Sequence, residues 1–161
     1  MTGKVLTYSP DSVRIELSGY ELTGITSVNV AMSSPRFSMI RGIRGYNTRK
    51  RAKDTSAILT ITVLQTSVTN TILTKILASD VVYGTAKLSV SVQDTGSRDT
   101  FVSSSNAFIV AHPTLEYQED ASTRTWEIAM LTTTMSVGGA YEPPISLFGN
   151  QIGLDTLTNL F

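Results

Sequence analysis

The chain has 161 residues, the length of one domain that can bury a hydrophobic core of its own. Its 13 basic and 13 acidic residues balance, so the overall charge indicates neither an acidic nor a basic partner. The absence of cysteine excludes a disulfide framework and a thiolate site. The chain has no apolar run long enough to cross a bilayer, so we expect no membrane among its partners.

The first part of the chain predicts an extended arm followed by two strands. Residues 1–12 are polar. In residues 13–17 every second position is apolar, which indicates a strand that turns at Gly19. Residues 25–32 predict a second strand, with Val28, Val30 and Met32 on one face.

Residues 33–55 hold most of the positive charge. Seven of the 13 basic residues lie between Arg36 and Lys53 without any Asp or Glu, so all 13 acids and the other six bases lie elsewhere. Gly42 and Gly45 punctuate this polar segment, which indicates a long exposed loop or a β-hairpin arm. A loop of this length is uncommon in a compact domain unless it has a function.

The segment 57–79 predicts a strand that leads directly into a helix. Apolar residues alternate from Ala57 to Val63, as in a half-buried strand. After Ser67, a suitable N-cap, the period changes to that of an amphipathic helix over residues 68–78. Its expected apolar stripe comprises Val68, Ile72, Leu73, Ile76 and Leu77.

Three further strands and a tail complete the expected elements. Residues 86–92 and 101–110 alternate on either side of a turn, and residues 124–132 form the last strand. Residues 136–161 are rich in Gly and Pro yet apolar, which predicts an extended tail that needs a surface. The predicted core comprises Leu59, Ile61, Val63, Ile72, Leu73, Ile76, Leu88, Val90, Trp126 and Ile128.

No arrangement of residues predicts catalysis. Asp94-Thr95-Gly96 matches the triplet of retroviral-type aspartic proteases, but its place between two alternating strands favours a hairpin turn. His112 is the only histidine and has no specific partner, and Glu116, Glu119 and Asp120 are typical of a solvated loop. We therefore expect no catalytic residue, no cofactor and no metal.

The basic segment is the strongest functional signal, and three interpretations remain open. Its cations could neutralise nucleic-acid phosphates while Tyr46 stacks on a base. They could instead pair with carboxylates of an adjacent copy, or the segment could be a solvated loop. Assembly is favoured because the rest of the chain is acidic and because Ile40 and Ile43 accompany the charges.

Several pieces of the sequence, in this order, resemble the tail tube proteins of contractile-tailed bacteriophages. They are Tyr8 to Val13, the arginine-bearing hairpin, Leu64-Gln65-Thr66-Ser67 followed by Asn70, and Thr123 to Trp126. The resemblance covers about residues 8–135. It departs where Val68 replaces an expected proline and where the tail after Gly139 is longer than usual.

The resemblance implies a mainly β (α+β) fold: an antiparallel β-sandwich or barrel with one flanking α-helix (68–78) and a long β-hairpin arm (33–55). This tail-tube domain would span residues 1–135, with an extended tail at 136–161. Six copies would form a ring, and rings would stack into the inner tail tube that conducts DNA from the capsid to the host cell. Alternatives are a tube-initiating baseplate or adaptor ring, the tube of a contractile injection system and, less favoured, a nucleic-acid-binding module.

The same resemblance implies partners and a place in the virion. The chain would bind itself, the tail sheath, the tape measure protein, and baseplate and terminator proteins, after assembly in the host bacterial cytoplasm. We expect the subunit or ring interface to contain Arg36, Arg41, Arg44, Tyr46, Arg49, Lys50, Arg51, Lys53, Glu116, Glu119 and Asp120. The lumen should be neutral or acidic and rich in Ser and Thr, because double-stranded DNA must pass without specific binding.

Overall fold

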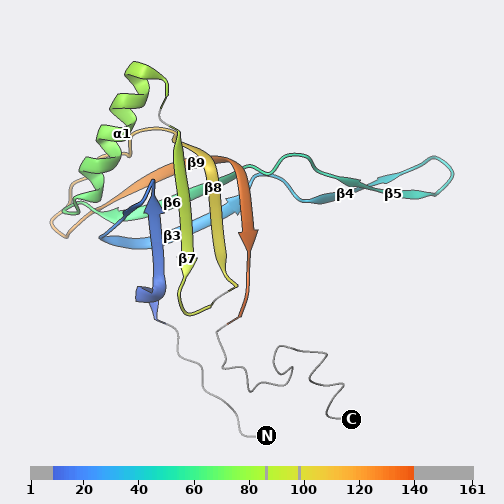
Figure 1. Ribbon diagram of the computed structural model, residues 1–161, viewed down its shortest axis with the longest axis horizontal. Helices are drawn as coiled ribbons and strands as arrows, with labels where there is room; N and C mark the ends of the chain where they lie inside the picture. The colour runs from blue at the N-terminus through green and yellow to red at the C-terminus, as the bar shows by residue number, and fades with distance from the viewer. Residues whose placement is uncertain (1–8, 86, 98, 140–161) are drawn as a thin grey trace, which may run out of the picture.

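A computed structural model describes residues 9–85, 87–97 and 99–139 (Figure 1). A short 3-10 turn, Pro10–Ser12, precedes the first strand. In chain order the elements are β1 (Val13–Leu17), β2 (Tyr20–Glu21), β3 (Ile25–Met32), β4 (Phe37–Arg41), β5 (Asn47–Arg51), β6 (Ala57–Leu64), α1 (Thr69–Tyr83), β7 (Leu88–Asp94), β8 (Phe101–Ile109) and β9 (Thr123–Ser136).

Seven of the strands form one antiparallel sheet in the order β2-β1-β7-β8-β9-β6-β3, and β4 and β5 form a separate hairpin. The sheet curls, so β1, β7 and β8 run steeply across β3 and β6 (Figure 1). The long strand β9 joins the two parts, because residues 123–130 pair with β6 and residues 128–136 pair with β8. Among the described residues the second sheet is the β4–β5 hairpin, so the architecture is a curled half-barrel and not a sandwich of two facing sheets.

This architecture confirms the predicted mainly β fold with one flanking helix and a hairpin arm. The bounds of β1 and β3 coincide with the predicted strands. Strand β9 continues to Ser136, four residues beyond the predicted end. After a register shift with β8, its buried positions change from even-numbered residues up to Met130 to Thr133 and the partly buried Met135. The predicted tail begins at this last strand residue, and most of it lies outside the described residues.

The core lies on the inner face of the curl. Most of the side chains that the sequence assigned to the core are 0–6% exposed: Leu59, Ile61, Val63, Leu73, Leu88, Val90, Trp126 and Ile128. Ile76 packs against this cluster while partly buried. Ile72 is only half-buried and does not belong to the cluster, which corrects its assignment.

Helix α1 is longer than predicted, and its buried stripe is shifted. The helix begins at Thr69, so its N-cap is Val68 and not the predicted Ser67, although the Ser67 hydroxyl accepts a hydrogen bond from the Thr69 amide (3.2 Å). The helix ends at Tyr83 and not at residue 78, because the first residue that breaks it is Gly84, in the left-handed conformation (φ +65°). Thr69, Leu73 and Leu77 form the buried stripe at a spacing of four, so Val68 is 56% exposed.

Asn70 joins the helix to the sheet. Its Oδ1 accepts a hydrogen bond from Nε1 of the buried Trp126 (3.0 Å), and its Nδ2 donates to the Leu64 carbonyl (2.9 Å) and the Ser67 carbonyl (3.3 Å). Two of the four pieces that carried the sequence resemblance, Leu64 to Asn70 and Thr123 to Trp126, therefore meet at one side chain, where the helix begins beside β6 and β9. In the described part of the chain, no helix combines the length and apolarity needed to cross a lipid bilayer.

Candidate assembly surfaces

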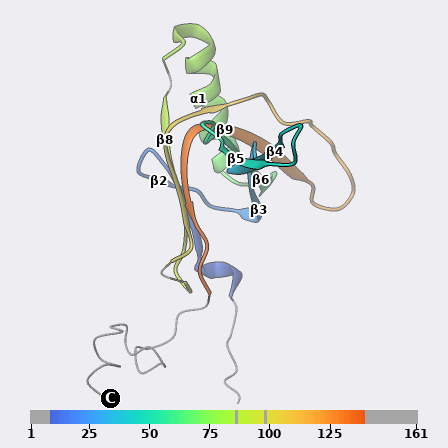
Figure 2. The ribbon, with the colours of Figure 1, turned by 90° about the vertical axis from the view of Figure 1, so that its right-hand side faces the viewer.

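The basic segment forms a hairpin that projects from the body of the molecule (Figures 1 and 2). Its base continues the pairing of β3 with β6, because the Ser33 amide donates to the Ser56 carbonyl (2.9 Å) and the Ala52 amide donates to the Arg36 carbonyl (2.8 Å). At its tip, Gly45 has φ +86°, a conformation that favours glycine. The arm is therefore a continuation of the sheet that extends beyond the core.

Asp54 fastens the base of the arm. Its Oδ1 accepts a hydrogen bond from the Ser56 amide (2.9 Å), and its Oδ2 accepts one from the Ser34 hydroxyl (3.3 Å). The backbone amide of Ser56, followed by the side chains of Ser56 and Ser34, lowers the pKa of Asp54 below its usual value. The carboxylate is thus ionised and bound to both sides of the hairpin at neutral pH.

The arm exposes apolar and cationic side chains together. Strand register places Phe37 opposite Arg51 and Met39 opposite Arg49, so these four residues share one face. The Arg49 guanidinium carbon lies 4.5 Å from the centre of the Phe37 ring, within cation–π range. Phe37 is nevertheless 49% exposed and Met39 72% exposed. Because a lone two-stranded hairpin is marginally stable in water, this face is a candidate contact surface.

All the arm residues assigned to the interface are exposed: Arg36, Arg41, Arg44, Tyr46, Arg49, Lys50, Arg51 and Lys53. Tyr46, at the distal end, is 79% exposed, and the adjacent Ile43 is fully exposed. The arm therefore presents both charge and apolar surface along its length.

The acidic residues lie in the connection between β8 and β9, which a buried arginine holds in place. Arg124 is 5% exposed, and its Nη1 donates to the Glu116 carbonyl (3.0 Å), the Ser122 hydroxyl (3.0 Å) and the Thr123 carbonyl (3.1 Å). The Ser122 hydroxyl donates in turn to Oε1 of Gln65 (2.5 Å). Neutral oxygens thus satisfy this buried charge, and they connect the loop to the turn between β6 and α1.

Above this network, the connection presents its side chains to solvent. The Tyr117 ring lies 4.9 Å from the Arg124 guanidinium carbon and is 75% exposed. Glu116, Glu119 and Asp120 are all exposed. We call residues 110–122 the acidic loop.

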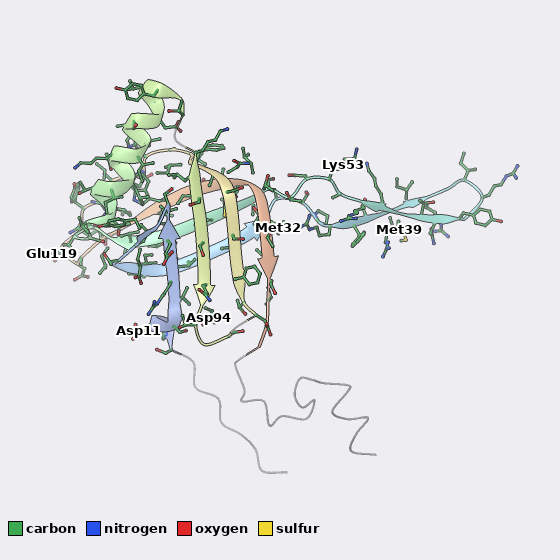
Figure 3. All side chains as sticks on the ribbon, in the orientation of Figure 1. Asp11, Met32, Met39, Lys53, Asp94 and Glu119 are labelled. Carbon is green, nitrogen blue, oxygen red and sulfur yellow. The ribbon has the colours of Figure 1, made fainter. Side chains whose placement is uncertain are left out.

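The arm and the acidic loop lie at opposite ends of the longest axis of the molecule. Figure 3 shows Glu119 at one end and Met39 and Lys53 at the other. The sequence placed these groups in one interface, and the structure does not bring them together within one subunit. A contact between them would join two copies of the chain.

The outer face of β1, β7, β8 and the end of β9 is polar. Strand register aligns two rows of side chains across these four strands: Glu16, Ser91, Ser103 and Thr134 in one, and Arg14, Gln93, Phe101 and Ser136 in the other. A hollow of about 420 Å³ lies over this face and is lined by Glu16 and by hydroxyl side chains that include Ser89, Ser105 and Thr132. We call this outer face of β1, β7, β8 and the end of β9 the hydroxyl face. Its two aligned rows contain one positive charge, Arg14, and one negative charge, Glu16, which balance.

The sequence interpretation missed two features: the burial of Arg124 and the exposed apolar end of α1. The alternation that placed Trp126, Ile128 and Met130 inward also places Arg124 inward, and this signal would have identified its burial. The final turn of α1 exposes Val81 (77%) and Tyr83 (73%), which lie beyond the predicted end of the helix.

Asp94 and His112, which were considered for catalysis, make contacts of a structural kind. Oδ1 of Asp94 accepts hydrogen bonds from the Ser12 hydroxyl and the Gly96 amide, both at 2.8 Å, as in the predicted turn. The ring of His112 lies 6.5 Å from that of Trp126. Within the described ranges no group of three or more acidic or histidine side chains could hold a metal ion.

Comparisons with known proteins connect this fold to tail tubes. No protein-family model matches the chain. It is 27% identical over 150 residues to the structural protein ORF10 of Pseudomonas phage KPP10, a match that covers 86% of each chain.

Solved structures give the clearest likeness. The tube-terminating cap of the anti-feeding prophage has a TM-score of 0.61 at 12% identity, covering 85% of this chain and 97% of that one. A chain of the sheath–tube complex of the contractile injection system PVC has a TM-score of 0.58 at 14% identity, covering 81% and 93%. A chain of the tail of an empty GTA particle with C6 symmetry also scores 0.58, at 10% identity, covering 81% and 100%. The fold is therefore that of tail tube and tube-terminating proteins, as the sequence resemblance indicated.

Proposed function

We propose that this chain, which has the fold of tail tube proteins, is a non-enzymatic subunit of the inner tail tube of a contractile-tailed phage. Six copies form a ring, and rings stack into a tube that conducts DNA from the capsid during ejection. The observation that carries the proposal is the placement of the basic arm and the acidic loop at opposite ends of one subunit. The C6 symmetry of the GTA tail supports the choice of six copies.

Complementary surfaces at two ends of a molecule favour head-to-tail contacts. Such contacts close into a ring or continue as a helical assembly, because each copy offers a free surface to the next. In the proposed contact, Arg49 and Arg51 of one copy pair with Glu116 and Glu119 of another. Phe37 and Met39 lose their exposed area in the same contact, which supplies an apolar contribution.

The hydroxyl face is the part of the surface best suited to the lumen. Its side chains form weak, neutral contacts with a phosphate backbone, whereas a cationic lining would hold DNA through the release of counterions. Seven basic residues gather on the arm and only Arg14 lies in the two aligned rows. We therefore assign the hydroxyl face to the inside of the tube and the arm to contacts between copies.

The remaining partners follow from the position in a tail. The outer surface binds the tail sheath, and the ends of the tube meet baseplate and terminator proteins. The tape measure protein and then double-stranded DNA occupy the lumen. The mature location is the virion, after assembly in the cytoplasm of the host bacterium.

A second candidate is a single ring that starts or terminates the tube. The observation that favours it is the similarity to the tube-terminating cap, whose TM-score of 0.61 is as high as the 0.58 of the sheath–tube chain. Electron microscopy of the concentrated protein distinguishes these candidates. Long tubes support the tube subunit or the tube of an injection system, and isolated rings support the terminator or initiator.

Reversal of the arm charges tests the proposed contact. The variant Arg49→Glu/Arg51→Glu should remain folded by circular dichroism yet form no tubes, because like charges then meet at the contact. Lys75→Glu/Lys87→Glu changes the net charge equally at exposed sites outside the arm and should still assemble. Full-length tubes from the arm variant would refute the proposal. Monomeric wild-type protein that binds DNA with a steep salt dependence would instead support the nucleic-acid-binding module.

A further inference from the structure

An apolar groove opens at the end of the half-barrel that lies away from α1. It has a volume of about 360 Å³ and lies between the start of β1, the end of β7, the start of β8 and the facing strand β3. Its apolar lining comprises Pro10, Val13, Ile15, Ile25, Val28, Val92, Phe101 and Val102. The only charged side chain among the lining residues is Asp94, which is already bonded to Ser12 and Gly96.

The groove is a part of the core that the described chain leaves uncovered. Inward side chains of β6, such as Leu59 and Ile61, are fully buried. Those of the neighbouring edge strand β3, including Ile25 and Val28, are only partly buried although they face the same interior. An additional apolar segment would complete this side of the core.

The described chain ends beside this groove. Thr100, which lines it, both accepts a hydrogen bond from the Gly138 amide (2.9 Å) and donates one to the Gly138 carbonyl (3.1 Å). A Cβ atom at Gly138 would lie 2.5 Å from Cβ of Asp99, so only glycine allows this approach. The chain is thereby fixed at the rim, and residues 140–161 continue from there.

The composition of residues 140–161 matches the groove. The segment contains nine large apolar residues and two charged ones, Glu142 and Asp155. An extended chain advances about 3.3 Å per residue, so Ile145 to Phe148 are within about 33 Å of the anchored Gly138. A segment tethered this closely has a high effective concentration at a neighbouring site.

We propose that Ile145-Ser146-Leu147-Phe148 of the same chain occupies the groove and completes the core of the half-barrel. The inference does not depend on ring or tube formation, because it concerns the single subunit. The N-terminal residues 1–8 and the tail of another copy are the rival occupants.

Disulfide trapping tests the proposal in the full-length chain, which has no cysteine of its own. The paired substitutions Val28→Cys and Leu147→Cys should cross-link within one chain in dilute solution, because a disulfide requires Cα atoms closer than about 7 Å. The matched control pairs Leu147→Cys with Ser89→Cys on the hydroxyl face, and it should cross-link at least ten times more slowly. Equal rates in the two variants would overturn the proposal.

Two further measurements exclude the rivals. In a mixture of single-cysteine chains, Val28→Cys with Leu147→Cys, predominant cross-linking between chains would show that the tail of another copy occupies the groove and would overturn the proposal. Faster trapping of Val28→Cys by Leu6→Cys than by Leu147→Cys within one chain would assign the groove to the N-terminus, with the same consequence. The variant Leu147→Asp/Phe148→Asp should bind several-fold more of an apolar dye than the wild type, and unchanged dye binding would contradict our assignment.

Discussion

Replacing Asn70 with alanine should destabilise the subunit more than alanine does at any exposed position of the helix. Asn70→Ala leaves Nε1 of Trp126, a side chain that is 1% exposed, without its acceptor. A buried donor left unsatisfied costs about 1–3 kcal/mol, and loss of the bonds to the Leu64 and Ser67 carbonyls adds about 0.5–1.5 kcal/mol. We expect a loss of about 2–4 kcal/mol in the free energy of unfolding, with Thr71→Ala, at an exposed helix site, near zero.

A double-mutant cycle isolates the contribution of the Trp126 bond. Urea unfolding is followed by circular dichroism on the wild type, Asn70→Ala, Trp126→Phe and the double variant, at concentrations that keep the protein monomeric. In the Trp126→Phe background, Asn70→Ala no longer leaves a buried donor unsatisfied, so its effect should fall by about 1–3 kcal/mol. The same loss in both backgrounds would refute the assignment of Asn70 as the partner of the indole.

Three other predictions follow from named contacts. Arg124→Met should open the acidic loop and raise the rate of chymotryptic cleavage at Tyr117 at least tenfold, because hydrogen bonds to a charged group contribute about 1.5–3 kcal/mol. The control Arg14→Met, at an exposed site, should leave the cleavage rate unchanged. Gly24→Ala should lower the free energy of unfolding by about 2–5 kcal/mol, because its Cβ would lie 2.6 Å from the Ser67 side chain at a positive φ. The control Gly19→Ala has a similar φ but open space, so it should lose only about 1–2 kcal/mol. Equal losses in the two variants would contradict the steric argument. The pKa of Asp54 is lowered in the folded state, so its stabilisation of the arm base is present above the pKa of the unfolded state and is lost as the pH falls through the pKa of the folded state. An NMR titration of the Ser56 amide should show this acid transition in the wild type and lack it in Asp54→Asn.

Local patterns predicted the strands well because each half-buried strand repeats with a period of two. Residues 13–17 alternate throughout and residues 28–32 alternate after a register shift near Ile25, and β1 and β3 have the predicted bounds. The helix was less accurate. Periodicity identified it, but the centre of its stripe depends on the sheet below, which buries Thr69 and leaves Val68 in solvent.

Long-range arrangement was beyond the sequence pattern. Nothing local indicates that β1 pairs with β7, or that β9 bends and pairs with both β6 and β8. The same limit applies to the candidate surfaces. The sequence identified Arg49 and Glu119 as charged and exposed, but only the fold places them at opposite ends of the subunit. The half-barrel with one flanking helix and a hairpin arm was expected from the resemblance to tail tube proteins and not from the periodicity of the sequence.

The uncovered hairpin has a consequence for how an assembly would begin. All residues of β4 and β5 are exposed, so in the proposed assembly a neighbouring subunit would supply the surface that stabilises the hairpin. The first pair of subunits to meet would have to order two such hairpins with few contacts in return, whereas a subunit that joins an existing end finds a rigid template. Growth would then be fast and spontaneous initiation slow, so the number and starting points of tubes would be decided by whichever component first offers that template.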